Sequence, residues 1–407
     1  MFSKENVCQH RWPGKMQKTN FGTDRFHVTS CNGSTQVAPC RMFKNNHLSM
    51  YKKYFFWCCL LVLSATGCFV QKQKVTRDEA IAFAKDLAAS VAIRNPNVFN
   101  NIFDADALKK KMLEASDGKL SYQDLAEIPE ALKKRRMGDE IVDAAKDGGM
   151  YEPVKFYEKN DTQHVIFRLY GNSGLNYHDI SLVHSGKDIK AADIYFYLTS
   201  EDFSKSLADI SVQLKNYLDP GNNIISIINK IKKYRQNDEN EKALELFNQL
   251  PDSLRHQKIF QLVHIQLTAN LDDEHTKALD EFQKLFPNEP GMFITALDIH
   301  MSHQEYDKAL TDINKMDSII NKDTFLDYYR GLMYKELKDT AASISCFENL
   351  YKNFPSFGAG IIELIAADTK SGQIDKAKKL VTVYRDNKKL NQENMDYILI
   401  KYPQLVK

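Results

Sequence analysis

Cysteine is nearly missing from most of this 407-residue chain. Six of its seven cysteines lie within the first 68 residues, and only Cys346 follows them. Residues 69–407 therefore cannot form a disulfide among themselves. Cys346 stands inside a helical pattern and is expected to pack as a small apolar side chain.

Short catalytic motifs are missing as well. No stretch resembles a phosphate-binding loop, a nucleophile elbow or a metal-binding triad. We therefore expect no cofactor, no metal and no enzyme activity.

The chain also lacks a strong charge of either sign. Nine of the 55 basic and two of the 53 acidic residues lie in the first 68, which leaves 46 basic against 51 acidic residues. This mildly acidic balance predicts no binding to nucleic acid.

What is present near the start is an apolar segment that follows Lys52 and Lys53 and ends in small residues at Ala65-Thr66-Gly67-Cys68. A charged stretch, an apolar run and a small-residue site are the order of a secretory signal. The small residues before Cys68 resemble the lipobox of bacterial lipoproteins. That resemblance implies a lipidated Cys68 as the first mature residue, on the periplasmic side of the outer or inner membrane.

The same segment has other interpretations. Tyr54 to Val70 is close to the shortest length for a single spanning helix, with the two lysines on the cytoplasmic side. A buried core helix is the third alternative. Residues 1–49 show no apolar period and are expected to be disordered or not translated, so that residues 50–68 hold the signal or anchor.

The C-terminal part, residues 205–407, is helical throughout and repeats itself. A small residue followed four positions later by an apolar one recurs at 243, 278, 309, 343 and 377, with spacings of 35, 31, 34 and 34. A period near 34 with two helices per unit resembles the tetratricopeptide repeat (TPR). The resemblance implies about five units stacked as an all-α superhelical solenoid. The residues expected to pack the repeats are Gly331, Tyr334, Ser343, Phe347, Pro355, Ala243, Ala278, Phe282, Ala309 and Ala377.

In that family the first helix of each unit lines a concave surface that contacts a protein partner. Here the first helices are expected at about 257–270, 291–302, 325–337 and 358–371. The candidate partner-binding residues on them are Gln266, His300, Asp327, Tyr328 and Arg330. Each alone is also compatible with an ordinary solvated side chain.

Residues 76–203 predict an α+β domain. A capping box at Thr76 and Glu79 begins a helix, further helices are expected over about 98–113 and 121–146, and four alternating segments then predict an antiparallel meander. Helices followed by such a sheet resemble cystatin-like cone folds, a resemblance of topology alone.

Cone folds often hold a ligand between helix and sheet, which raises a second functional hypothesis. The residues that would line such a pocket are Arg168, Tyr177, Asp179, Tyr195 and Tyr197. Strand alternation places Tyr177 with Asp179 on one face and His178 on the other, so that His178 and Asp179 cannot form a catalytic dyad within the strand. A face covered by a helix or by a partner is the alternative.

Three functions are therefore open. The first is a membrane-anchored, extracytoplasmic scaffold that binds a protein through its repeats. The second is a small-molecule-binding protein or enzyme that uses the α+β domain. The third is self-assembly through the repeats.

Overall fold

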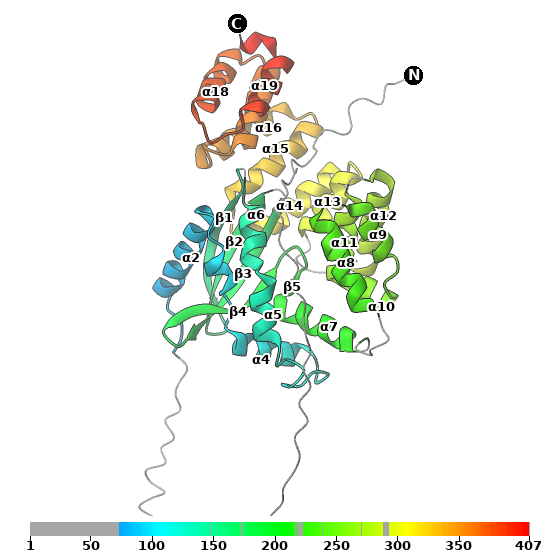
Figure 1. Ribbon diagram of the computed structural model, residues 1–407. Helices are drawn as coiled ribbons and strands as arrows, with labels where there is room; N and C mark the ends of the chain where they lie inside the picture. Colours follow the sequence, from blue (N-terminus) through cyan, green and yellow to red (C-terminus); the bar gives the residue numbers. More distant parts are fainter. Residues whose placement is uncertain are drawn as a thin grey trace, which may run out of the picture. The chain divides into compact units, whose positions relative to one another are not determined.

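The computed structural model describes residues 73–406, apart from gaps at 147, 172–173, 216, 218–222, 238, 270 and 288–292 (Figure 1). The signal predicted at residues 50–68, with Cys68, lies outside the described residues, as do residues 1–49. Contacts within Lys74–Lys407 join that part of the chain into one unit.

The first helix begins where the capping box predicts. In α2 (Arg77–Ala92) the Glu79 backbone N–H donates to Thr76 Oγ1 at 3.3 Å, and the Thr76 N–H donates to Glu79 Oε2 at 2.8 Å. These two bonds satisfy backbone donors that a helix start otherwise leaves unpaired. One face of α2, which includes Ala84 and Leu87, is buried.

Two predicted helices are each broken in two. The segment near 98–113 forms α3 (Asn97–Asn100) and α4 (Ala105–Ala115), because the chain between them runs extended beside strand β4 (Asp188–Phe196). Phe103 bridges to Ala191 there, and the Ala191 N–H donates to the Ile102 carbonyl at 2.8 Å. This extended segment ends at Asp104, whose carboxylate accepts from the Ala107 N–H and caps the start of α4.

The segment predicted as one helix over 121–146 contains α5 (Ile128–Arg135) and α6 (Met137–Ala144). Pro129 lies in the first turn of α5, where its missing N–H costs no helical hydrogen bond. Arg136, between the two helices, has a left-handed backbone with φ of 53°. A non-glycine residue in that conformation cannot continue a right-handed helix.

The sheet is an antiparallel meander in the order β1-β2-β3-β4-β5, with five strands rather than the four predicted. The long strands are β1 (Met150–Lys159), β2 (Thr162–Gly171), β3 (Gly174–Ser185) and β4 (Asp188–Phe196). The additional strand, β5 (Glu201–Asp202), has only two residues, and its alternation was too short to recognise in the sequence. It pairs with β4 at Tyr195 and Phe196.

One face of the sheet packs against the preceding helices. Phe167 and Ile180 lie in one buried cluster with Leu87 of α2 and Met112 of α4. The next helix, α7 (Phe203–Lys215), adds Phe203 and other side chains to the same cluster. The interior between helix and sheet is thus filled with apolar side chains.

The remainder of the chain forms helix pairs that contact their neighbours in chain order, as a stack of repeats requires. Each pair has a first and a second helix joined by a short turn. The pairs are α8 (Ile224–Gln236) with α9 (Asn240–Phe247), α11 (Lys258–Thr268) with α12 (Asp272–Leu285), α13 (Phe293–Ser302) with α14 (Tyr306–Ile320), α15 (Asp327–Glu336) with α16 (Thr340–Asn353), and α17 (Gly358–Lys370) with α18 (Ile374–Asp386).

Further helical segments complete this part of the chain. They are α10 (Asp252–Arg255), the 3-10 turn η1 (Thr324–Leu326) before α15, α19 (Gln392–Lys401) and the 3-10 turn η2 (Pro403–Leu405).

The small anchor residues of the repeat lie where helices of a pair meet. Ala243, Ala278, Ala309 and Ala377 have no exposed surface, and Phe282 is also buried. Gly331 and Phe347 face each other between α15 and α16, and Ser343 Oγ donates to the Gly331 carbonyl at 2.8 Å. Tyr334 is half-buried on α15, and Pro355 follows the end of α16.

We expect Gly331→Ala to destabilise the fold. A Cβ at this position would lie 2.6 Å from Cε1 of the buried Phe347 ring, closer than packed carbon atoms tolerate. Overpacking of this kind costs about 1–3 kcal/mol. Urea unfolding measures the loss, and the double variant Gly331→Ala with Phe347→Leu should lose less than the two single variants together. Additive losses would contradict a direct clash.

Candidate functional site

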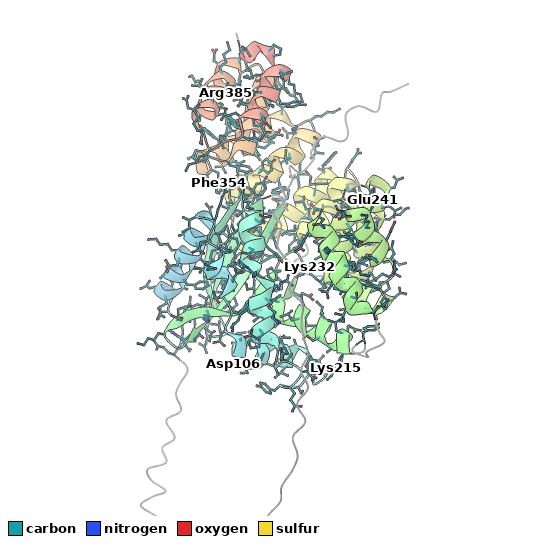
Figure 2. All side chains as sticks on the ribbon, viewed as in Figure 1. Asp106, Lys215, Lys232, Glu241, Phe354 and Arg385 are labelled. Atoms are coloured by element: carbon teal, nitrogen blue, oxygen red, sulfur yellow. The ribbon has the colours of Figure 1, made fainter. Side chains whose placement is uncertain are left out.

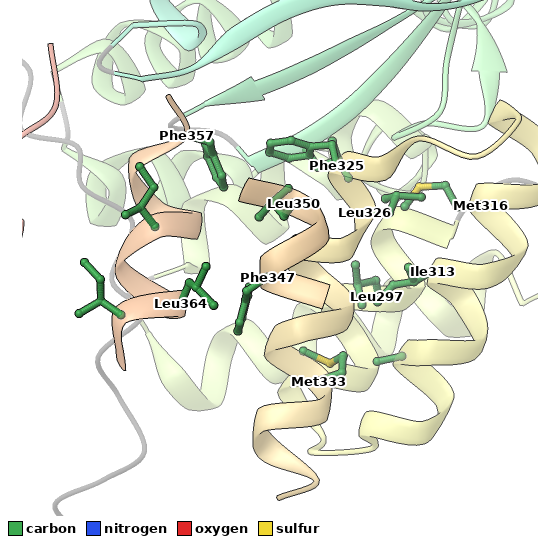
Figure 3. Packing of buried hydrophobic residues seen from close by; sticks show 14 of the residues in the cluster. Leu297, Ile313, Met316, Phe325, Leu326, Met333, Phe347, Leu350, Phe357 and Leu364 are labelled. Atoms are coloured by element: carbon green, nitrogen blue, oxygen red, sulfur yellow. The ribbon is translucent and has the colours of Figure 1, made fainter. Parts of the chain in front are cut away.

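The second face of the sheet is covered by the helical repeats. Tyr177 and Tyr197 share one buried cluster with Met316 of α14 and with Phe325 and Leu326 of η1. Figure 3 shows Phe325 and Phe357 between the strands and the helices below them. The residues expected to line a pocket therefore lie on a face against which the repeats pack.

A buried ion pair joins the sheet to the helical repeats within this cluster. Arg168 Nη1 on β2 donates to Asp323 Oδ1 at 2.5 Å, and both side chains are almost fully buried. The Tyr177 hydroxyl donates to Asp323 Oδ2 at 2.8 Å, so that one carboxylate serves two side chains of the sheet. The second nitrogen, Arg168 Nη2, donates to Glu152 Oε2 at 2.7 Å. Burial, and next the nearby Asp323 charge, hold the pKa of Tyr177 well above its ordinary value.

Aromatic rings surround the Arg168 guanidinium. Its central carbon lies 4.8 Å from the ring centres of both Phe325 and Phe354 (Figure 2 labels Phe354). Tyr170 on the same strand contacts the rings of Phe325 and Phe357. Desolvated cation–π contacts add to the attraction of the ion pair. The arrangement fixes the sheet to the repeats and leaves the Arg168 nitrogens Nη1 and Nη2 with intramolecular partners.

The other predicted pocket residues are also engaged within the chain. Asp179 accepts from the Tyr157 hydroxyl and contacts His164 Nδ1 at 3.0 Å. Tyr195 forms a hydrogen bond of 2.8 Å with Ser200 Oγ, and its ring meets that of Tyr197 edge to face.

His178 points to the opposite face from Asp179. Its Nδ1 lies 3.2 Å from the Tyr151 hydroxyl within the cluster that faces α2. Burial lowers the pKa of His178 to about 3, so that the ring is neutral at physiological pH. The side chains of His178 and Asp179 are therefore separated by the sheet, as strand alternation predicts.

The five predicted partner-binding residues differ in what they contact. Gln266 is exposed on α11 and accepts from Arg235 of α8. His300 contacts Asp312 at 2.6 Å, and Tyr328 packs among the rings of the sheet interface.

The remaining two, Asp327 and Arg330, form an ion pair at 2.7 Å. Arg330 also binds Asp317 at 2.6 Å, and Asp327 accepts from Asn349. These contacts hold helices α14, α15 and α16 together. A role of the five residues in binding a partner stays a prediction.

Sequence reasoning missed Asp323, the acceptor at the centre of the interface. It follows Asn321 and Lys322, which both have positive φ, and its carboxylate accepts from the Phe325 N–H at 3.1 Å as a cap of η1. A turn and a helix cap are readable from the sequence. Nothing local indicates that the same carboxylate meets Arg168, which is 155 residues away.

Cys346 on α16 is half-buried, and burial, with a smaller effect of the Asp327 charge, raises the pKa of its thiol to about 11. Because the thiolate is the reactive form, we expect alkylation of Cys346 by iodoacetamide at pH 8 to be at least ~10-fold slower in the native chain than in urea. Peptide mass spectrometry at Cys346 measures both rates. Equal rates would contradict the assigned environment.

A shallow cavity of about 290 Å³ lies elsewhere, between α3, α4, α5 and the β3–β4 turn. Its lining includes the apolar side chains Phe99, Phe103 and Leu132 and the basic side chains Lys133 and Lys190. None of the predicted pocket residues lines it.

Within residues 73–406, as far as they are described, no helix has the length and apolar character needed to cross a membrane.

Comparisons with known proteins add little. No family model and no curated protein matches the chain. Among solved structures, one titled "MamA 41-end from Desulfovibrio magneticus RS-1" is 16% identical and covers 41% of this chain and 98% of its own, with a TM-score of 0.34. A MamA double mutant is 16% identical over 44% of this chain and 97% of its own, with a TM-score of 0.33. A tetratricopeptide repeat protein from Parabacteroides merdae is 15% identical over 50% of this chain and 77% of its own, also with a TM-score of 0.33.

Proposed function

We propose that this protein is a membrane-attached, extracytoplasmic scaffold that binds a protein partner through its helical repeats. The observation that carries the proposal is the stack of helix pairs, in which side chains of the first helices remain exposed although the sheet packs against the same array. Membrane attachment rests on the sequence of residues 50–68, with Cys68 as the acylated residue. Cystatin-like topology of the sheet domain, absence of catalysis and absence of nucleic-acid binding belong to the same proposal.

The contacts between sheet and repeats involve the ends of helices. Lys155 Nζ donates to the Ile319 carbonyl at the end of α14, and Asp323 lies just after that end. Thr295, near the start of α13, donates to the Leu198 carbonyl. Exposed side chains lie in the middle of some first helices, among them Lys232 on α8 and Asp298 on α13, and we infer that the partner binds there.

Equivalent positions define this surface, which we call the first-helix face. Lys232, Asp298 and Leu332 each stand eleven residues before the anchor of their unit, at 243, 309 and 343. Stacked units place equivalent residues on one side of the array. Lys232 and Asp298 are exposed, and Leu332 is partly exposed.

A photo-crosslinking residue at Lys232 tests the proposal, and one at Glu241 is the matched control. Both positions are exposed and labelled in Figure 2, but Glu241 lies on a second helix, α9. In cells that express the full chain, we expect a protein crosslink from position 232 and not from 241. Equal crosslinking from both positions, or none from 232, would overturn the proposal. Mass spectrometry of the mature N-terminus tests acylation of Cys68 separately.

The contacts between the sheet and the repeats make deletion of the repeats an unsuitable test of partner binding. Deletion of residues 205–407 would remove Asp323 and leave Arg168 and Tyr177 without their acceptor. The same deletion would expose to water the apolar sheet side chains that the repeats cover, such as Ile166 and Leu175, and this loss of burial destabilises the fold. Loss of binding after that deletion would therefore not separate a missing surface from an unfolded domain.

A further inference from the structure

The cavity beside α3, α4 and α5 is lined by side chains from segments that are far apart in the chain. They belong to α3 and its link to α4, the start of α4, α5 with the start of α6, and the adjoining ends of β3 and β4. The volume of about 290 Å³ is just below the range of roughly 300–1,000 Å³ that small-molecule sites span. Since an apolar cavity of about 150 Å³ can hold benzene, this one has room for one or two rings.

The aromatic side chains of the lining are held by contacts with other rings. Phe99 is buried, and its ring meets that of Tyr151 edge to face with centres 5.7 Å apart. The Phe103 ring stacks on Phe203 of α7 with centres 5.2 Å apart. Because both rings are fixed by the fold, a ligand that packs against them does not have to order them first.

The start of α6 packs closely against α3 at the same cavity. The Gly138 N–H donates to Asn100 Oδ1 at 2.7 Å, and a Cβ on Gly138 would collide with the Pro96 carbonyl oxygen. Met137, next to Gly138, is buried and belongs to the lining. The hydrogen bond fixes the Asn100 amide, whose Nδ2 has no partner among the described residues and can donate to a ligand.

One cation of the lining, Lys190 on β4, is not neutralised within the described part of the chain. Lys190 is only partly exposed, and its ammonium forms no ion pair or hydrogen bond with a described residue. The acids of the lining do have partners. The Asp104 carboxylate accepts from the Ala107 N–H at 2.7 Å. Asp106 pairs with Lys109 at 2.8 Å. The lining therefore favours an anion, because a charge-assisted hydrogen bond to Lys190 is stronger than a neutral one.

The second cation of the lining, Lys133 on α5, is already paired. It is exposed and lies 2.9 Å from Glu130, one turn earlier on the same helix. Since Glu130 neutralises Lys133, Lys190 is the cation that an acidic ligand is expected to contact.

We propose that this cavity binds a small aromatic carboxylate, with the ring against Phe99 and Phe103 and the carboxylate paired with Lys190. The mixed lining selects for this class of ligand. A neutral ring would leave Lys190 without a counter-ion, and a hydrophilic anion would leave the aromatic side chains in contact with water. The cavity is separate from the first-helix face, so this inference goes beyond the proposed function and does not depend on it.

Titration calorimetry of the full chain with 2-naphthoate, and with 2-naphthamide as its uncharged isostere, tests the proposal. We expect 2-naphthoate to bind with a dissociation constant of about 0.1–1 mM, which is what about 13 non-hydrogen atoms supply. Lys190→Met should weaken binding of 2-naphthoate at least ~5-fold and leave that of 2-naphthamide unchanged. Lys187→Met is the matched control, because it removes the same charge from an exposed residue of the adjoining turn that is not part of the lining.

A variant that fills the cavity separates this site from binding elsewhere. Leu132→Trp, on α5, should abolish binding of both compounds, and its urea midpoint shows whether it is folded. Undiminished binding to folded Leu132→Trp would place the ligand elsewhere and overturn the proposal. No binding of 2-naphthoate at millimolar concentration, or equal affinity of the unaltered chain and Lys190→Met, would also overturn it. Equal weakening by Lys187→Met would do the same, since surface charge rather than Lys190 would then attract the acid.

Discussion

Replacing Asp323 by alanine is expected to cost about 3–5 kcal/mol of folding free energy, the range for a buried ion pair that loses one member. Arg168 would keep one carboxylate partner among the described residues, Glu152, whose side chain is 53% exposed, and Tyr177 would lose its acceptor. Urea unfolding of the full chain, followed by circular dichroism, measures the shift in midpoint. The charge itself is the cause, because Arg168 cannot release its proton to relieve the penalty.

A matched control separates this effect from the loss of any surface ion pair. Asp161→Ala breaks the pair with Lys74, in which both side chains are mostly exposed, and should shift the urea midpoint far less than Asp323→Ala does. Arg168→Met combined with Asp323→Leu replaces the pair by apolar side chains and should recover part of the loss. Equal destabilisation by Asp323→Ala and Asp161→Ala would contradict the assigned interface.

Acid is expected to unfold this protein through His178. Burial lowers the pKa of His178 to about 3, while in the unfolded chain the ring takes its ordinary value near 6.5. Between these two pH values the unfolded state binds more protons than the folded state. The free energy of unfolding therefore decreases by about 1.4 kcal/mol for each unit by which the pH is lowered. From pH 6.5 to pH 4 the loss attributable to His178 is therefore about 3 kcal/mol.

The urea midpoint of unfolding is measured at pH 7, 6, 5 and 4 for the unaltered chain and for His178→Gln, and the two midpoints are compared at each pH. Glutamine can form hydrogen bonds with Tyr151 and Asn176 but does not titrate. The difference is needed because burial raises the pKa of Asp193 to about 6, which favours the folded state as pH falls through that value. His303→Gln, near the surface, is the control. Identical pH dependence in the unaltered chain and His178→Gln would show that His178 is not a buried neutral ring.

Much of the local structure was readable from the sequence because its causes are local. The capping box at Thr76, the alternation of β1 to β4 and the anchors at 243, 278, 309, 343 and 377 each depend on residues a few positions apart. The predicted first helices agree with α11, α13, α15 and α17 within two residues at each end. The two broken helices and the strand β5 were missed because a turn at Arg136, a bridge at Phe103 and a two-residue pairing leave almost no periodic signal.

The sequence by itself determined the order of the parts: an apolar segment ending at Cys68, helices with an antiparallel sheet, and paired helices with a period near 34. It also determined which strand residues share a face, since alternation separates His178 from Asp179. Only the tertiary structure decided that the repeats cover the face of Arg168 and Tyr177. The physical reason is distance along the chain, because a contact across 155 residues depends on how whole elements pack and leaves no pattern in the neighbouring sequence.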